Sequence, residues 1–289
     1  MTPPGRAPSS NAVLRTPPER TDAILGVEVE HAPVPPPWPA AVTRRDRVWA
    51  DEDRALVRIR DLSLYVAGGD RVVVQAPDLA ARSEHDYLVY GWAARLLLWQ
   101  RRRLTLHAAL VVTPDGRAVA LAGDSGAGKS TTTVELIRRG WRYACDDVAE
   151  LALPGPQAVP FERPVHLSDD AARLLGADPA VGRPLPWRSK RVYALEPDLL
   201  VRPLAAVVRL SAAPVDRPVA QVLEPVEALM SLLRIGDRIG IVELPALRRA
   251  HVDWLGALVR TVPVVNLDRP ATGDTVGHVA DLVEEAVLR

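Results

Sequence analysis

The stretch "AVALAGDSGAGKSTTTVELIRRGWRYACDD" (Ala118–Asp147) decides the fold of the second half of this chain. It begins with an apolar run and passes through a loop of glycines and small polar residues. A segment with helical periodicity follows and ends at Gly140, as glycine often does just past a helix. A short apolar segment then ends in two carboxylates. This strand–loop–helix–strand order predicts an α/β domain.

The glycine-rich loop matches the pattern G-x-x-x-x-G-K-[ST], and it lies between a predicted strand and a predicted helix. Glycines allow successive backbone N–H groups to surround phosphate oxygens, and the helix N-terminus adds positive charge. We therefore expect ATP to bind here, with Lys129 at the β- and γ-phosphates and Ser130 on Mg²⁺. The expected nucleotide-binding residues are Gly123, Asp124, Ser125, Gly126, Ala127, Gly128, Lys129, Ser130 and Thr131.

Two adjacent aspartates, Asp146 and Asp147, follow the loop after one helix and one short strand. In a βαβ unit, the loop and this pair would lie at the same edge of the sheet. One carboxylate can hold magnesium, and the other can accept the proton of an attacking hydroxyl. Adjacent strand residues point in opposite directions, so both can serve only if the strand ends there.

His107 lies in the apolar run "LHAALV", one strand before the loop strand. If the two strands are neighbours, this histidine also approaches the phosphate end of the loop. It then joins Lys129 and Asp146 as a candidate catalytic residue.

Lysine is rare in this chain. Of 36 lysine and arginine residues, only Lys129 and Lys190 are lysines. A lysine retained among so many arginines suggests a need for the compact ammonium group. We therefore expect Lys190 to have a functional role.

Other classes of loop-containing proteins fit less well. A GTPase would carry N-K-x-D, whereas "NLDRP" at Asn266 lacks the lysine. A transporter ATPase would carry an L-S-G-G-Q-like signature, which we do not find. An ATP-binding switch or ATPase without phosphoryl transfer remains an alternative, as does a kinase of small-molecule hydroxyls.

The composition and net charge of the chain bear on which partners it can bind. The 289 residues are 48% hydrophobic and 25% charged, and the formal net charge is zero. No overall field favours nucleic acid or an anionic membrane, and the longest apolar runs are too short to span a bilayer. We expect a cytoplasmic protein, because a single cysteine, Cys145, excludes an internal disulfide and the N-terminal residues lack an apolar signal segment.

The chain divides into three predicted parts. Residues 1–20 are rich in proline, serine and arginine, which predicts a disordered tail. Residues 21–103 predict a small β-rich domain with a hairpin turn at Gly68-Gly69-Asp70, followed by a linker helix. Residues 104–289 predict the α/β domain that carries the glycine-rich loop.

The stretch "LHAALV…AVALAGDSGAGKS…LIRRGWRYACDDVAEL" resembles the catalytic domain of the HPr kinase/phosphorylase-like serine kinases. The resemblance covers about forty residues specifically and implies a P-loop kinase domain with an HPr-kinase-like core. It also implies ATP- and Mg²⁺-dependent transfer of phosphate to a serine or similar hydroxyl of a protein or peptide.

By position in that resemblance, Ser130 and Asp147 would bind magnesium and Asp146 would be the general base, although the two aspartate roles could be exchanged. Glu150 matches an acidic residue after the pair and is a third candidate metal ligand. Lys190 matches a downstream lysine of the smaller relatives, which implies that Lys190, with its neighbour Arg191, contacts substrate or the γ-phosphate. The hexameric state of the HPr enzymes makes a homo-oligomer an expectation by analogy.

The chain departs from the HPr-specific enzymes at two points. Thr131 stands where those enzymes place a glutamate, and "RIGDRIGIVELP" matches their downstream glycine-rich signature only loosely. Smaller relatives linked to lasso and other RiPP peptide maturation phosphorylate precursor peptides, so such a peptide is a candidate acceptor beside HPr itself. The phosphorylase reaction is a further option.

Overall fold

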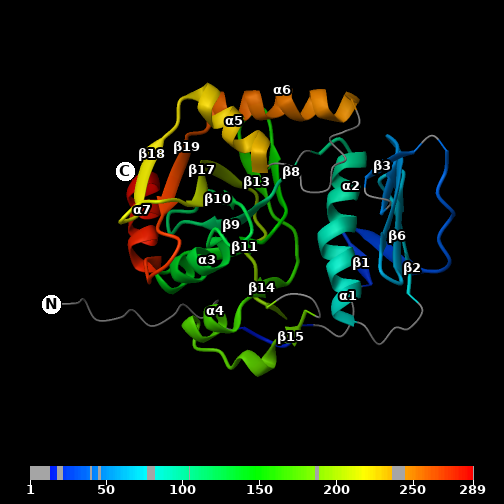
Figure 1. Ribbon diagram of the computed structural model, residues 1–289, viewed down its shortest axis with the longest axis horizontal. Helices are drawn as coiled ribbons and strands as arrows, with labels where there is room; N and C mark the ends of the chain where they lie inside the picture. The colour runs from blue at the N-terminus through cyan, green and yellow to red at the C-terminus, as the bar shows by residue number, and fades with distance from the viewer. Residues whose placement is uncertain are drawn as a thin grey trace.

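The computed structural model describes residues 14–17, 22–39, 41–44, 47–76, 82–103, 105–185, 189–235 and 245–288. These residues form two main sheets, with a helical column between them (Figure 1). No helix in the described ranges is both long enough and apolar enough to cross a membrane.

The first sheet has seven strands, and its order is β1-β2-β7-β6-β5-β4-β3. The side chains of β6 alternate between buried and half-buried positions, which is the pattern of a sheet with one covered face. The predicted turn at Gly68-Gly69-Asp70 is confirmed as the β6–β7 connection. The strands are β1 (Ala23–Ile24), β2 (Val27–His31), β3 (Val42–Arg44), β4 (Val48–Ala50), β5 (Arg54–Ile59), β6 (Leu62–Ala67) and β7 (Arg71–Gln75).

The helical column covers this sheet. It consists of α1 (Arg82–Asp86), the π-helix η2 (Tyr87–Ala93) and α2 (Ala94–Gln100). Leu88 and Leu97 are fully buried in one cluster with apolar side chains of the sheet. The sequence predicted a linker helix here, whereas the structure shows that the column also faces the second unit (Figure 1).

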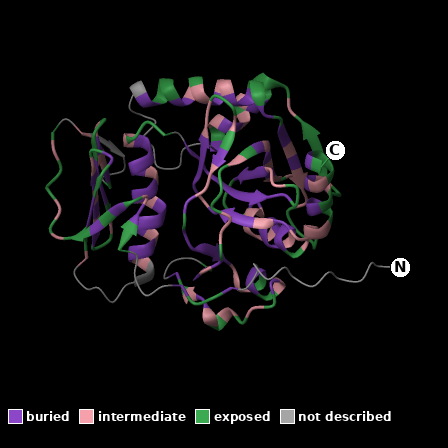
Figure 2. Ribbon diagram, turned by 180° about the vertical axis from the view of Figure 1, so that it is seen from behind, coloured by how far each residue is buried: buried purple, intermediate pink, exposed green. Residues whose placement is uncertain are grey.

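The second sheet has nine strands, and its central strands are buried (Figure 2). Strands β10, β17 and β19 are parallel. The order is β11-β9-β10-β17-β13-β12-β8, with β19 beside β17 and β18 beside β19. The strands are β8 (Thr105–Leu106), β9 (Ala108–Val112), β10 (Ala118–Gly123), β11 (Arg142–Cys145), β12 (Ala149–Ala152), β13 (Gln157–Val159), β17 (Arg202–Ala212), β18 (Val219–Val222) and β19 (Val264–Arg269).

The strand pairing around the loop differs from a simple βαβ unit. The antiparallel strand β9 lies between β10 and β11. A tight turn, in which Thr113 N–H donates to Arg117 O at 2.8 Å, makes β9 and β10 direct neighbours. Strand β11 therefore adds to the far side of β9. Because β10 and β11 still run in the same direction, their carboxyl ends reach the same edge of the sheet.

Two pairs of helices cover the second sheet. Helices α3 (Lys129–Arg138) and α7 (Val276–Leu288) pack on one face, in a cluster that includes Leu121 and Val208. Helices α5 (Pro225–Ile235) and α6 (Pro245–Thr261) pack on the other, in a cluster that includes Leu110 and Val207. Residues 236–244 of the segment "RIGDRIGIVELP" lie outside the described residues.

A third, three-stranded sheet has the order β14-β16-β15 and lies below α3 in Figure 1. The Ser168 hydroxyl caps α4 by accepting from Ala171 N–H at 3.2 Å. The elements are β14 (Val165–Leu167), α4 (Asp169–Leu174), the 3₁₀ helix η3 (Pro179–Val181), β15 (Arg183–Pro184) and β16 (Arg191–Tyr193).

The predicted disordered tail over residues 1–20 needs a correction at 14–17. Arg15 exchanges two backbone hydrogen bonds with Ala194, at 2.9 and 3.0 Å. Leu14 is buried in the cluster that contains Ile137 and Tyr143. An apolar side chain within the polar tail thus anchors this segment. Residues 1–13 and 18–20 lie outside the described part of the chain.

Candidate active site

The glycine-rich loop connects the buried strand β10 to the first turn of α3. Gly123 has a φ of 139°, and a Cβ there would lie 2.3 Å from the carbonyl oxygen of Leu210 on the neighbouring strand. Gly128 has a φ of 104°, and a Cβ there would meet Arg269 Nε at 3.1 Å. Side chains are therefore excluded at both ends of the loop, where the backbone turns from strand to helix.

Arg269, at the end of β19, supports the loop from the side. Its Nε and Nη2 donate to the carbonyl oxygens of Ala127 and Gly126, both at 2.9 Å. The guanidinium group thereby fixes two carbonyls and adds positive charge beside the helix N-terminus. Sequence reasoning missed this residue, because it lies about 140 residues from the loop.

The ammonium group of Lys129 lies over the loop. Its Nζ donates to Gly123 O at 2.7 Å and to Asp124 O at 3.1 Å. The same Nζ lies 3.4 Å from His107 Nε2. The expected approach of His107 to the loop is thus realised, because β9 runs antiparallel to β10 and begins where β10 ends.

His107 connects Lys129 to Asp147. Its Nδ1 lies 3.0 Å from Asp147 Oδ1 and 2.9 Å from Asp147 O. Arg95 Nη2, which can only donate, also lies 3.1 Å from Nδ1. We assign the proton to Nδ1, because Asp147 offers it two acceptor oxygens and Lys129 can only donate to Nε2. Burial lowers the pKa of His107 more than the hydrogen bond to Asp147 raises it, so the ring is held neutral.

Asp147 sits in a left-handed turn with a φ of 67°, which ends β11 at the acidic pair. Arg95, from the helical column, donates from Nη2 to Asp147 O at 2.7 Å and lies 3.1 Å from its Oδ2. Burial raises the pKa of Asp147. The charge of Arg95 and the hydrogen bond of His107 oppose that effect and hold the pKa well below its usual range.

Asp146 is held more loosely. Its side chain is buried, and Oδ2 lies 3.4 Å from the backbone nitrogen of His166. Because the chain turns at Asp147, both carboxylates reach the same cavity instead of pointing to opposite faces of the sheet. The strand thus ends at the acidic pair, as the sequence pattern requires if both aspartates are to face one site.

Lys190 also reaches the loop. Its Nζ donates to Ser130 Oγ at 3.0 Å. Lys129 Nζ thus contacts the start of the loop, at Gly123 and Asp124, whereas Lys190 contacts Ser130 in the first turn of α3. Lys190 precedes β16, in the small third sheet, so three separate parts of the fold meet here.

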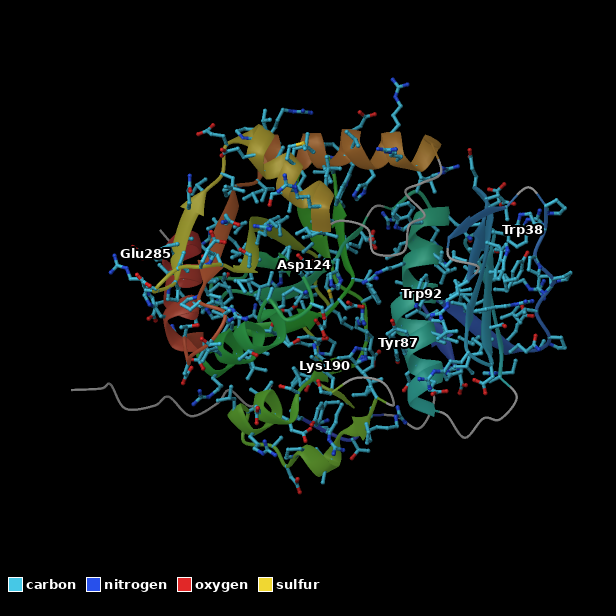
Figure 3. All side chains as sticks on the ribbon, viewed as in Figure 1. Trp38, Tyr87, Trp92, Asp124, Lys190 and Glu285 are labelled. Atoms are coloured by element: carbon cyan, nitrogen blue, oxygen red, sulfur yellow. The ribbon has the colours of Figure 1, made fainter. Side chains whose placement is uncertain are left out.

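A cavity of about 440 Å³ lies between the loop and the helical column. Figure 3 labels Tyr87 and Trp92 on the column, and Asp124 and Lys190 on the opposite side. The lining residues are Tyr87, Gly91, Trp92, Arg95, His107, Asp124, Ser125, Gly126, Gly128, Lys129, Ser130, Thr131, Asp146, Asp147, His166, Ser168, Lys190 and Arg269. We call this the loop cavity.

A second cavity, of about 640 Å³, adjoins the same loop. It shares Gly128, Thr131 and Arg269 with the loop cavity, and α4 and the start of α7 form its other walls. The first turn of α3 therefore separates two hollows.

Two predicted site residues lie elsewhere. Glu150 is buried in β12, pairs with Arg103 Nε at 3.1 Å and does not line the loop cavity. After the Asp147 turn, the chain has already entered a new strand beside β8, which contradicts a role as metal ligand. Arg191, the first residue of β16, does not line the loop cavity. Its Nε lies 2.9 Å from Asp169 Oδ1.

The comparisons with known proteins are limited. No protein-family model matches the chain. A stretch of 90 residues is 31% identical to Para-Rep C2 of Milk vetch dwarf C2 alphasatellite, over 30% of this chain and 32% of that protein. The chain thus spans about a third of the length of this curated relative.

Among solved structures, the HPr(Ser) kinase/phosphatase from Coxiella burnetii is distantly similar. The alignment covers 64% of this chain and 93% of that chain, with 16% identity and a TM-score of 0.32. A similarity of this size defines neither the fold nor the activity. The arrangement of residues around the loop cavity is more informative about function.

Proposed function

We propose that this protein is an ATP- and Mg²⁺-dependent phosphotransferase that moves the γ-phosphate to a hydroxyl group of a protein or peptide. One observation carries the proposal. A lysine on a glycine-rich loop at a helix N-terminus and two adjacent carboxylates line the same cavity. Cationic groups for phosphates and an anionic group for the acceptor proton are the two requirements of phosphoryl transfer.

The loop side of the cavity would bind the phosphates. The N–H groups in the first turn of α3 have no partners within the helix and favour anions. Lys129 would exchange its loop carbonyls for the β- and γ-phosphates. Because Lys129 Nζ lies 3.4 Å from His107 Nε2, a γ-phosphate bound by Lys129 would lie close to His107 and the acidic pair. The nucleoside would then leave past Thr131 into the second cavity, which has the volume for it.

The residues also fit magnesium. In such sites Mg²⁺ keeps several waters and binds through one or two carboxylates plus substrate phosphates. Ser130 Oγ and an aspartate would supply the protein ligands. Among the described residues, no group of three or more His, Cys, Asp or Glu side chains is arranged to hold a metal by itself. Bound magnesium would neutralise charge on the phosphate oxygens.

The two aspartates differ in a way that supports separate roles. His107 and Arg95 engage both oxygens of Asp147, which stabilises its anionic form. Asp146 is less constrained, and we assign the general base to it. The acceptor oxygen forms a bond to the γ-phosphorus, and the bond to the β,γ-bridging oxygen breaks with its electron pair on ADP. The hydroxyl proton passes to the Asp146 carboxylate.

The acceptor is narrowed by the resemblance of the loop and the acidic pair to the HPr-kinase-like serine kinases. We extend the proposal to a serine of a peptide, with a RiPP or lasso precursor as one candidate. An ATP-binding switch would use the same loop without transfer, an ATPase would transfer the phosphate to water, and a small-molecule kinase would use a different hydroxyl acceptor.

The test is incubation with ATP labelled at the γ-phosphate, magnesium and an extract of the organism that encodes the protein. Label on a protein or peptide is the expected result. Label recovered only as inorganic phosphate would support an ATPase and contradict the proposal. If mass spectrometry identifies the labelled compound as a small molecule with a hydroxyl group, the result would support a small-molecule kinase instead.

A further inference from the structure

Gly91 is an unusual residue for its position. It lies inside η2, where glycine costs about 1 kcal/mol relative to alanine. It lines the loop cavity, and a Cβ built there would meet no atom within 4 Å. No neighbouring protein group uses the space that the missing side chain leaves. That space belongs to the cavity.

Two aromatic residues flank this space. Tyr87 precedes Gly91 by one turn, and Trp92 follows it directly; both are half-buried and line the cavity. The π-helical turn is wider than an α-helical one, and such turns are frequent at functional sites. We call the surface formed by Tyr87, Gly91 and Trp92 the Gly91 notch.

The notch faces a wall of different chemistry. Lys129, Asp146 and Asp147 line the opposite side of the same cavity. The charged wall suits the phosphates and the reacting hydroxyl, whereas the notch offers ring faces and open backbone. Since the proposed path of the nucleotide leads into the second cavity, the notch is left for the remainder of the acceptor.

We propose that the Gly91 notch binds the acceptor as a peptide segment in which an apolar or aromatic residue adjoins the reacting serine. The inference rests on the proposed function. Tyr87 and Trp92 would pack against the adjoining side chain, and the absence of a side chain at Gly91 lets the peptide backbone approach closely. The serine oxygen then lies between Asp146 and the γ-phosphate, and its proton and the ADP leaving group are accounted for as above.

The test uses a library of serine-centred peptides with each residue type beside the serine, assayed with γ-labelled ATP. We expect wild-type protein to label peptides with aromatic or large apolar neighbours about tenfold more than those with aspartate or lysine. Trp92→Leu should raise KM for the preferred peptides and weaken the preference for aromatic neighbours.

Gly91→Leu places a side chain in the notch. Its Cβ would meet no protein atom within 4 Å and leucine is a good helix former, so the fold should be retained. We expect peptide labelling to fall about tenfold or more, while the Kd of Mg·ATP in calorimetry changes by less than about twofold. Gly256→Leu is the matched control. Gly256 lies in α6, outside the cavity, where a Cβ would meet only Arg260 Nη1 at 3.5 Å, and labelling should be unchanged.

Three outcomes would overturn the inference. Undiminished labelling by both Gly91→Leu and Trp92→Leu would remove the notch from acceptor binding. A large loss of Mg·ATP affinity in Gly91→Leu would show that the notch holds the nucleotide. Wild-type protein that phosphorylates extract components but no library peptide would overturn the peptide assignment alone. If it phosphorylates neither, the proposed function fails as well.

Discussion

The two walls of the loop cavity differ in how strictly their chemistry determines the residue types. The loop wall, from the 105–288 region, consists of a glycine-rich turn, a lysine, a histidine and two aspartates at fixed spacings. The wall from the helical column consists of Tyr87, Gly91, Trp92 and Arg95, which follow no known spacing rule. Phosphate chemistry specifies residue types, whereas an acceptor surface requires only shape. The first wall can therefore be recognised from residue types and spacing, whereas the second cannot.

Arg95 joins the two walls. It belongs to the helical column, yet it bonds the backbone oxygen of Asp147 and lies beside its carboxylate. The N-terminal region thus supports the acidic turn, and under the proposal it would also supply the acceptor surface. It lines the loop cavity and is more than an appended domain with a linker.

The comparison predicts its largest effect at the loop wall. Lys129→Ala should reduce transfer by about a thousandfold or more and should weaken ATP binding, because it removes the charge that contacts the β- and γ-phosphates. Calorimetry and labelled-ATP transfer measure the two effects. Lys129→Arg should also fail, since the planar fork cannot occupy the place of the ammonium group. Strong ATP binding by Lys129→Ala would contradict the assignment of Lys129 to the β- and γ-phosphates.

Acid should destabilise the folded protein through His166, which lines the loop cavity. Burial, with the charge of Arg163, lowers the pKa of His166 to about 4 from an ordinary value of 6.5. The unfolded chain therefore binds more protons in that window, and stability falls as pH drops through it, by at most about 3 kcal/mol. Urea unfolding at several pH values measures this slope. His166→Asn should flatten it, and an unchanged slope would contradict the assignment.

Arg95→Met should have an intermediate effect. Without the guanidinium group, the Asp147 turn loses a charge partner and a hydrogen bond. We expect kcat to fall about tenfold, with little change in the Kd of Mg·ATP. Arg95→Lys should restore part of the loss, because the charge is retained. A variant that loses ATP affinity without losing kcat would place Arg95 in nucleotide binding instead.

The smallest effect is expected behind the loop wall, at Cys145. Burial raises the pKa of this thiol to about 12, and its Sγ lies 3.3 Å from Val148 O. Iodoacetamide at neutral pH should leave the native protein unmodified, although it alkylates the protein in urea. Cys145→Ala should retain transfer within about twofold. Rapid alkylation of the native protein would show that β11 opens to solvent.

The loop wall could be anticipated from sequence because its chemistry constrains neighbouring residues along the chain. The glycine pattern, His107 and the acidic pair were recognisable within about forty residues of one another, and the rarity of lysine marked Lys190. Local spacing failed where the chain changed direction. Glu150 is close to Asp147 in sequence, but the left-handed turn carries it into another strand.

The helical wall could not be anticipated in this way. Arg95 is one arginine among many, and Tyr87, Gly91 and Trp92 look like ordinary positions of an amphipathic helix. Their significance arises only when the column packs between the two sheets and faces the loop. The pairing of β9 with β10 follows from the turn at Thr113–Arg117, but the addition of β11 to the far side of β9 could not be read from a strand–helix–strand pattern.

The most direct test of the account is single-turnover transfer from labelled Mg·ATP by wild-type protein and Asp146→Asn. Asp253→Asn, an exposed change on α6, serves as the control. The account predicts that Asp146→Asn binds ATP normally but transfers phosphate about a hundredfold more slowly or worse, while the control matches wild type. Equal transfer rates for Asp146→Asn and wild type would contradict the claim that this cavity activates a hydroxyl acceptor.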